Sequence, residues 1–220
     1  LLTGDELDEA IQHALNALRQ AADTARVYIF ENFEDEDDGL CMKQTFESYA
    51  PGVEPEIDNP VLQKVIYSEG FSRWERHLSK GEAIEGQIAT FPEEEQAILA
   101  PQGIISMLVL PILVSGNWWG FIGFDETRVD YDWRAGEITL LRTAAEMIGV
   151  YLTRIETEQA LRTSQRRYRE IFTGSRDGFV MVDDTAKITN ANEALCEMLG
   201  YTLEELKAMD DFYVITPERW

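Results

Sequence analysis

Cysteine and histidine are scarce in this chain, which holds two of each among 220 residues. Cys41 and Cys196 lie far apart with no second cysteine near either, so the sequence predicts neither a disulfide framework nor a thiolate metal site. We expect both to be buried, reduced thiols. His13 and His77 fall on predicted amphipathic helices, where a surface or hydrogen-bonded imidazole is expected. No metal site is therefore predicted.

Long apolar runs and positive charge are also lacking. No stretch approaches the roughly 20 apolar residues that a membrane helix needs, and no signal peptide opens the chain. The 41 acidic residues outnumber the 19 lysines and arginines, and the formal net charge of -22 repels phosphate backbones and anionic lipid. We therefore expect a soluble, cytoplasmic fragment that neither binds nucleic acid nor inserts in a membrane. Because it begins at Leu1 without a methionine, we expect it to be part of a longer protein.

Recognisable catalytic motifs are missing as well. The sequence has no Ser-His-Asp grouping, no glycine loop of the kind that holds phosphate and no metal-ligand spacing. The acidic run at residues 34–38 lacks the alternating oxygen ligands and the distal glutamate of a calcium-binding EF-hand. We interpret this run as the solvated tip of a hairpin, and we do not expect the fragment to be an enzyme.

One continuous helix is predicted over residues 133–172, which contain no proline. Its apolar residues recur at steps of three and four, the spacing that places side chains on one helix face. That seam consists of Ile138, Leu141, Ala145, Ile148, Leu152 and Ile155. Four further apolar residues make the apolar face of the helix wider than this seam, namely Leu140, Ala144, Met147 and Val150. The pattern fits a homodimer formed through this helix, and equally a helix packed on its own domain.

Short helices and two strand hairpins are predicted upstream of this helix, a combination that fits an α+β fold. The predicted elements are a helix over 5–21, strands over 26–33 and 40–49, short helices over 61–68 and 71–79, an edge strand over 84–89, a helix from Pro92 to near Gly103, and strands over 104–114 and 117–127. The last two strands meet at Ser115-Gly116 or Gly116-Asn117, which suits a tight turn. Trp118 and Trp119 must point to opposite faces of their strand, and we expect at least one under the terminal helices.

Residues 5–155 resemble a GAF domain of bacterial multidomain sensor proteins. The likeness rests on SMLVLPI at 106–112, WWGFIGFDE at 118–126, Trp133, and a helix with Leu-Leu at 140–141 and Ala-Ala at 144–145. The resemblance implies a central antiparallel sheet with helices on both faces and a long exit helix. It does not imply one ligand, because GAF domains bind cyclic nucleotides, bilins, haem, small metabolites or nothing.

The residues from Leu161 onward resemble the first part of a PAS domain. The matching motifs are RRYREIF at 166–172, DGFVMVD at 177–183, NAN at 190–192 and LGY at 199–201. Asn192 is predicted to cap one helix, and Thr202 with Glu205 to form a capping box on the next. The resemblances divide the chain into a GAF-like domain over 1–155, a signalling helix over 156–172 and a partial PAS-like α/β segment over 173–220.

The GAF resemblance narrows the ligands without naming one. Phe121 followed by Asp125-Glu126 fits the tail of the cyclic-nucleotide signature, but the upstream Asn-Lys pair is absent. Bilin and haem are not expected, because they need a positioned cysteine or histidine. The cofactor is therefore unknown. The residues that we predict around an apolar ligand pocket, with plain core packing as the alternative, are Trp74, Ile104, Ser106, Leu108, Trp119 and Phe121.

These patterns favour a regulatory sensory module within a multidomain signalling protein. In that hypothesis a small molecule or a partner binds the GAF-like domain, and the helix relays the change to the PAS-like segment and to an output domain elsewhere in the protein. The full-length protein would be a histidine kinase or a cyclic-dinucleotide enzyme such as a diguanylate cyclase. The alternative is a ligand-free dimerisation and spacing module, whose core is filled by its own side chains.

Overall fold

The structure is a computed structural model that describes residues 4–209 and residue 215. The chain forms two compact units, residues 1–154 and residues 155–220. The helix α4 (Ala135–Gly174) begins in the first unit and ends in the second. The α+β class and the long exit helix are confirmed, whereas the predicted functional boundaries at 155 and 172 remain a prediction.

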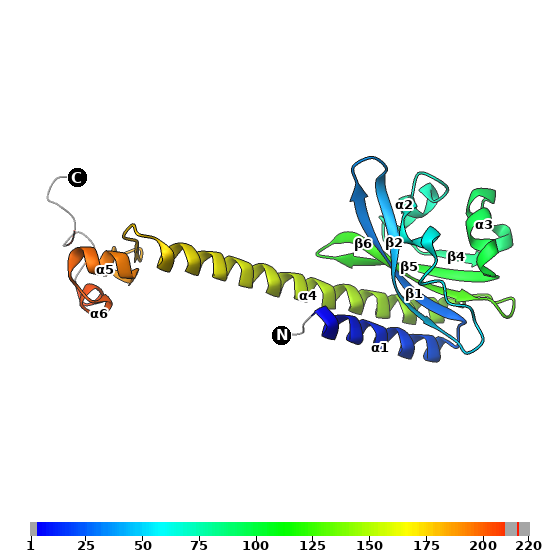
Figure 1. The fold of residues 1–220 in the computed structure, drawn as a ribbon. Coiled ribbons are helices and arrows are strands. Elements are labelled where there is room, and N and C mark those ends of the chain that lie inside the picture. The colour runs from blue at the N-terminus through cyan, green and yellow to red at the C-terminus, as the bar shows by residue number, and fades with distance from the viewer. Residues whose placement is uncertain (1–3, 210–214, 216–220) are drawn as a thin grey trace. The chain divides into compact units, whose positions relative to one another are not determined.

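The first unit is built on one six-stranded antiparallel sheet with the strand order β3-β2-β1-β6-β5-β4 (Figure 1). The strands are β1 (Arg26–Asp35), β2 (Gly39–Tyr49), β3 (Val65–Ile66), β4 (Ile84–Gln87), β5 (Ser106–Val114) and β6 (Asn117–Glu126). Residues rich in β-branched and aromatic side chains form the central strands, because such side chains pack well on a pleated surface. Ser115 and Gly116 form the β5–β6 turn with φ of 52° and 80°, the left-handed region that such turns require.

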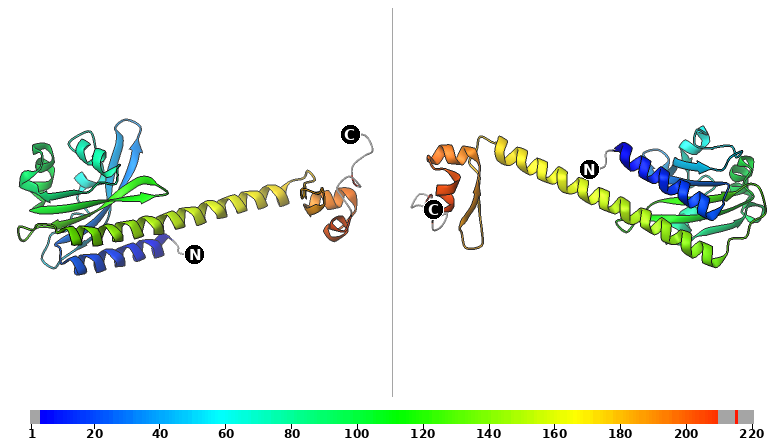
Figure 2. Two further views of the ribbon diagram at one scale, coloured as in Figure 1. Left: turned by 180° about the vertical axis from the view of Figure 1, so that it is seen from behind. Right: turned by 90° about the horizontal axis from the view of Figure 1, so that it is seen from below.

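Helices cover both faces of this sheet. The helix α1 (Gly4–Ala22) lies beside the first part of α4 on one face (Figure 2), where both pack on a core that includes Leu15, Leu110 and Ile122. The other face carries η1 (Pro60–Gln63), α2 (Ser72–Leu78), η2 (Ile88–Thr90), α3 (Glu93–Leu99) and η3 (Ala100–Gln102). The sheet therefore separates two apolar cores, one under the long helices and one under the short ones.

One predicted helix is wrong. Residues 61–68 were expected to be helical, but the chain forms the short 3-10 helix η1 and then the strand β3. The Asn59 side chain accepts a hydrogen bond from the Val61 N–H at 3.0 Å, which starts η1. The β-branched pair Val65 and Ile66 then pairs with Met42 and Cys41 at the edge of the sheet. Edge pairing thus outweighs the local helical pattern.

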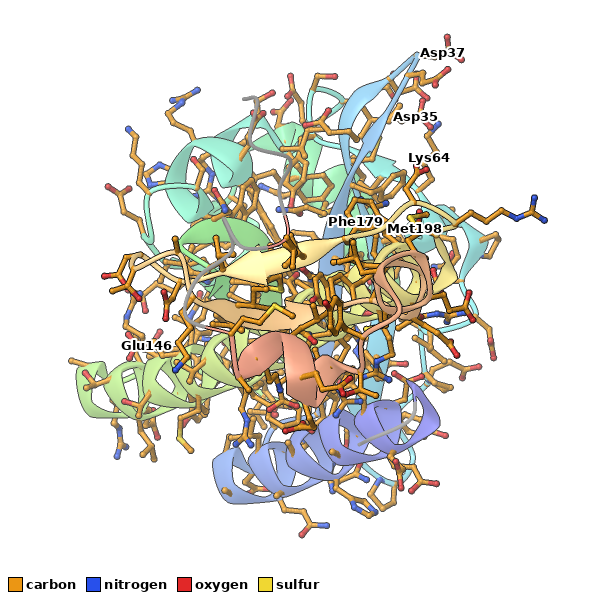
Figure 3. All side chains as sticks on the ribbon, turned by 90° about the vertical axis from the view of Figure 1, so that its left-hand side faces the viewer. Asp35, Asp37, Lys64, Glu146, Phe179 and Met198 are labelled. Atoms are coloured by element: carbon orange, nitrogen blue, oxygen red, sulfur yellow. The ribbon has the colours of Figure 1, made fainter. Side chains whose placement is uncertain are left out.

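The acidic run lies at the tip of the β1–β2 hairpin, as predicted. Figure 3 shows Asp37 at this tip, with Asp35 and Lys64 beside the same hairpin. The Lys64 Nζ lies 2.7 Å from Asp35 Oδ2 and 2.6 Å from Asp38 Oδ2. A lysine therefore already pairs with the carboxylates that a cation would need, and among the described residues no group of three or more His, Cys, Asp or Glu side chains could hold a metal ion.

The second unit holds a small core of its own. The strands β7 (Val180–Val182) and β8 (Ile188–Ala191) form an antiparallel pair, followed by α5 (Glu193–Leu199) and α6 (Leu203–Lys207). Ile188, Ala191 and Leu206 are its buried residues. Both predicted caps are confirmed, since Asn192 accepts from the Leu195 N–H and Thr202 forms a capping box with Glu205.

Candidate functional site

A cavity lies between the sheet and the short helices of the first unit. It leaves about 30 Å³ for the centres of water-sized molecules, which is room for about two waters. The residues that line it are Arg26, Tyr28, Phe30, Met42, Gln44, Glu47, Glu56, Leu62, Phe71, Trp74, Ile98, Leu99, Gln102, Ile104, Phe121 and Asp125. They come from three neighbouring strands and from the helices and loops that cover them.

The structure brings three of the predicted ligand residues together. Trp74, Ile104 and Phe121 line the cavity. Leu108 and Trp119 instead pack in the core under α1 and α4, on the opposite face of the sheet, and Ser106 is fully buried without lining the cavity. For Leu108 and Trp119 the predicted position is therefore wrong. Leu108 lies on the face of β5 that points away from the cavity. On β6 a register shift leaves Trp119 as an extra residue between the pairs Ile112–Gly120 and Leu113–Trp118, so Trp119 and Phe121 lie on opposite faces although they are two residues apart.

The two tryptophans at the start of β6 do lie on opposite sides of the sheet. Trp118 packs against the core on the cavity side, and Trp119 packs against the core under the terminal helices. Trp118 also contacts Tyr67, with ring centroids 5.2 Å apart. This confirms the expectation that one of the pair supports the long helices.

Aromatic rings form one wall of the cavity. The Phe30 and Phe121 rings stack with centroids 5.0 Å apart, and the Trp74 ring meets Phe121 edge-on at 5.6 Å. Phe71 meets Trp74 edge-on at 4.9 Å, and Tyr28 meets Phe30 edge-on at 5.6 Å. These contacts hold the rings in place, so the wall is preformed.

The Trp74 ring is held from behind by a buried carboxylate. Glu95, on α3, is 1% exposed, and its Oε2 accepts a hydrogen bond from Trp74 Nε1 at 2.9 Å. The Arg73 side chain donates to both oxygens of Glu95, at 2.8 Å and 2.6 Å. This contact ties α2 to α3 above the cavity, and the charge of Glu95 is compensated by an arginine outside the cavity lining.

The opposite end of the cavity is built around a buried arginine. Arg26 is 1% exposed, and its Nη2 donates to Asp125 Oδ2 at 3.2 Å and to the Gln102 carbonyl at 3.1 Å. Its Nη1 lies 3.6 Å from Glu56 Oε1. The Tyr28 hydroxyl donates to the other Asp125 oxygen at 2.7 Å. Arg26 and Asp125 face each other across paired strands, which is why residues 99 apart in sequence meet.

The carboxyl groups at this end of the cavity outnumber the positively charged side chains that line it. Burial raises the pKa of Asp125 to about 6, although the neighbouring Arg26 guanidinium acts to lower it. Burial also raises the pKa of Glu47, even though its carboxylate accepts hydrogen bonds from the Glu56 and Ile57 N–H groups. One guanidinium thus faces three carboxyl groups, those of Asp125, Glu47 and Glu56.

Two polar atoms of the lining residues have no hydrogen-bond partner within the described part of the chain. They are Arg26 Nε, a donor, and Gln44 Oε1, an acceptor. Gln44 is 4% exposed and stands opposite Phe30 in the β1–β2 pair. Because buried polar atoms are nearly always hydrogen-bonded, both atoms call for a water or a ligand in the cavity.

Sequence reasoning missed this polar end. Arg26, Gln44, Glu47 and Asp125 sit within or beside apolar strands, and a charged residue inside such a strand is the signal that could have marked them. Their meeting depends on strand pairing, which a single-sequence pattern does not supply.

The predicted seam of α4 packs on the chain's own sheet over most of its length. Leu141, Ala145 and Leu152 are buried in the core against the chain's own sheet, and Ile138 and Ile148 are half-buried against it. Ile155, which is half-buried, falls in the second unit. The face that the first five residues form therefore stabilises the domain itself.

The exposed apolar residues of α4 lie on another side of the helix. Leu140 is 69% exposed, Met147 is 67% exposed and Val150 is 71% exposed. Leu140 and Met147 also line a surface groove of about 330 Å³ together with residues of α1, including Leu18 and Ala22. These are three of the four residues that made the predicted apolar face of the helix wider than the seam.

Two contacts fasten α4 to the β5–β6 hairpin. The Ser115 N–H donates to Thr153 Oγ1 at 2.8 Å. At Gly149 the helix comes so close to the hairpin that an added Cβ would lie 2.3 Å from the Leu113 carbonyl oxygen. The hairpin that reaches the cavity through Phe121 and Asp125 is therefore also the hairpin on which the long helix rests.

Comparison with known families agrees with this architecture. The model of the GAF domain matches residues 6–152, and the model of a PAS domain matches residues 166–219. Both are sensory domain families. Within the described residues, no helix is long and apolar enough to cross a membrane.

Two similar proteins are named as a histidine kinase and as a sensor. The chain is 40% identical over 161 residues to the methanogenesis regulatory histidine kinase FilI of Methanothrix harundinacea, a match that covers 73% of this chain and 18% of that protein. It is 28% identical over 134 residues to the methyl sulfide methyltransferase-associated sensor of Methanosarcina acetivorans, covering 59% and 13%. The chain thus spans less than a fifth of the length of these two relatives.

A solved structure shares the fold. The GAF3 domain of Slr1393 from Synechocystis sp. PCC6803, in its photoproduct state, superposes with a TM-score of 0.59 at 22% identity, covering 70% of this chain and 98% of that one. This likeness concerns the fold alone. The family matches and the fold together show that the chain belongs to the GAF domain family, and a PAS segment follows its GAF domain.

Proposed function

We propose that this stretch is the regulatory sensory module of a cytoplasmic histidine kinase. A small molecule binds in the cavity of the GAF domain, and α4 carries the resulting change to the PAS segment and to an output domain elsewhere in the protein. The module itself catalyses no reaction. The observation that carries the proposal is the cavity whose lining includes two buried polar atoms without partners, Arg26 Nε and Gln44 Oε1.

The β5–β6 hairpin supports a path from this cavity to α4. On β6, Phe121 and Asp125 line the cavity, while Ile122 and Phe124 pack in the core under the long helices. A ligand that shifts β6 would therefore act on both faces of the sheet. The hairpin also holds α4 through the Thr153 contact, so two positions of the hairpin would correspond to two positions of the helix.

The exposed side of α4 supports homodimerisation of the module. Leu140, Met147 and Val150 are spaced by seven and three residues, which places them on neighbouring turns of one helix face. A second copy of the same helix would cover this face, and the buried seam would remain with the sheet. The interface that we propose is therefore shifted around the helix from the seam that the sequence pattern suggested.

Charged substitutions on the two sides of α4 separate these roles. We expect the double variant Met147→Glu, Val150→Glu to give monomers while changing the free energy of unfolding by less than about 1 kcal/mol, because both side chains are exposed in the monomer. Leu152→Glu, on the buried side, should instead lower that free energy by about 3 kcal/mol. Light scattering and urea unfolding measure the two effects. A wild-type monomer, or a double variant that still dimerises, would contradict the proposed interface.

Native mass spectrometry tests the sensing role directly. We expect protein purified gently, without added ligand, to carry a reproducible extra mass that is lost on denaturation. Ile104→Phe should lose that mass, because the larger ring fills a cavity with room for only about two waters. Bare wild-type protein in repeated preparations would favour the alternative, a ligand-free dimerisation and spacing module. The ligand-free alternative is supported by the aromatic side chains that occupy much of the cavity region.

A further inference from the structure

The charge balance of the cavity selects among ligands. The three carboxyl groups of Asp125, Glu47 and Glu56 share one cation, Arg26, and Arg26 already contacts the first and last of them. An anion placed here would meet an arginine whose charge is already compensated and two further carboxylates. A cation would reduce the repulsion among the acids, and burial of the acids strengthens that attraction because the local dielectric is low.

The aromatic wall favours the same kind of molecule. The rings of Phe30, Phe121 and Trp74 line one cavity, together with the phenol ring of Tyr28. An aromatic ring presents a negative face that attracts organic cations, most strongly where water is excluded. The two contributions, rings and carboxyl groups, act on one ligand because they line one cavity.

The unpartnered amide oxygen of Gln44 indicates which group of the ligand it would bind. Gln44 Oε1 is a buried acceptor without a donor among the described residues, so a ligand that carries an N–H group would satisfy it. Arg26 Nε, the other unpartnered atom, is a donor, and a single water in the same cavity would satisfy it.

We infer that the cavity selects a small protonated amine, whose ammonium N–H donates to Gln44 Oε1 while its alkyl groups lie against the aromatic wall. This inference rests on the proposed function, since it names the ligand class of the same site. Only a compact molecule is compatible with the cavity, whose free volume corresponds to about two waters. Bilin, haem and cyclic nucleotides are all much larger than that.

Three compounds with four non-hydrogen atoms each provide the test on the full 220-residue chain. They are isopropylammonium, isopropanol and acetate, which are similar in size and differ in charge. We expect isopropylammonium to bind and to shift the Trp74 indole N–H resonance in NMR titrations. Isopropanol should bind about ten-fold more weakly, because it lacks the charge, and acetate should not bind. Strongest binding by acetate, or binding by none of the three, would overturn the inference.

A matched pair of variants checks the role of Gln44. Gln44→Met keeps the length of the side chain and removes the acceptor, so the affinity for isopropylammonium should fall about ten-fold. Gln20→Met, at an exposed position on α1, should leave it unchanged. Unchanged affinity in Gln44→Met would overturn the assignment of the donor contact. The ranking of the three compounds on the wild-type chain holds whether or not the variant folds. If acetate binds most tightly of the three, or if native mass spectrometry detects a bound compound that is not an amine, the proposed sensory function is supported and the inference of an amine ligand is refuted.

Discussion

Gly149→Ala is expected to lower the free energy of unfolding of the GAF domain by about 3 kcal/mol or more. A Cβ at this position would lie 2.3 Å from the Leu113 carbonyl oxygen, and 3.3 Å from its carbonyl carbon. Both neighbours are backbone atoms, so no side chain can rotate away. The helix α4 must move off the β5–β6 hairpin, which breaks the packing of Leu152 and the Ser115–Thr153 hydrogen bond nearby.

The sign of this effect makes the experiment decisive. In an exposed helix position, replacing glycine by alanine stabilises a protein by about 1 kcal/mol, since alanine has the higher helix propensity. Gly136, near the start of the same helix, has nothing within 4 Å of an added Cβ and serves as the matched control. Urea unfolding followed by tryptophan fluorescence should give opposite shifts for Gly149→Ala and Gly136→Ala. Equal midpoints would refute the close contact between helix and hairpin.

Arg26→Met is expected to cost about 3 to 5 kcal/mol at pH 8, the usual penalty for removing one partner of a buried ion pair. Methionine roughly keeps the length and apolar stem of the arginine. Asp125, which is 1% exposed, then has only the Tyr28 hydroxyl as a close side-chain partner among the described residues. The buried carboxylate must lose its charge or become hydrated, and either event lowers the stability of the folded state.

The pH dependence of the two proteins should differ in a defined direction. In the wild-type protein the pKa of Asp125 is about 6, above its ordinary value of 3.8, so the folded state holds a proton that the unfolded chain has released. This group therefore contributes stability below about pH 4, and the contribution is lost as the pH rises to about 6. Without Arg26 the pKa rises further, so the decline continues above pH 6. The deficit of Arg26→Met should thus be larger at pH 8 than at pH 5.

Two further variants test whether the loss of stability in Arg26→Met comes from the unpaired charge of Asp125. Arg166, on the exposed surface of α4 in the second unit, forms an i to i+4 ion pair with Glu170, and Arg166→Met should change stability by less than about 1 kcal/mol at both pH values. Asp125→Asn added to Arg26→Met should recover part of the loss at pH 8, because no buried charge is then left unpaired. An Arg26→Met deficit that is the same at pH 5 and pH 8 would refute the electrostatic cause.

Local sequence signals predicted much of what the structure contains. The β5–β6 turn, the caps at Asn192 and Thr202 and the continuous helix α4 all depend on residues within a few positions of one another. Such features follow from turn chemistry, capping and the absence of proline, which act along the chain. The same signals failed at Val65–Ile66, where pairing with β2 decided the conformation.

The amphipathic pattern of α4 shows where the sequence alone stops. The steps of three and four correctly described an apolar face, but they could not say whether the sheet or a second helix covers it. In the structure Ala145 and Leu152 are buried against the sheet, and Gly149 permits the close approach. A helix that packs on a sheet and a helix that packs on a second helix need the same apolar pattern. The reason is that the free energy of burial depends on apolar area and not on which element covers it.

By itself the amino-acid sequence determined the fold class, the order of elements outside residues 61–68, the exposed acidic hairpin tip and the resemblance to GAF and PAS domains. Only the tertiary structure decided which face of β5 and β6 meets the cavity, and that Arg26 and Asp125, 99 residues apart, form a buried pair at its end. The reason is physical. Periodicity and capping are properties of neighbouring residues, whereas the polar end of the cavity exists only once strand register brings distant side chains out of water together.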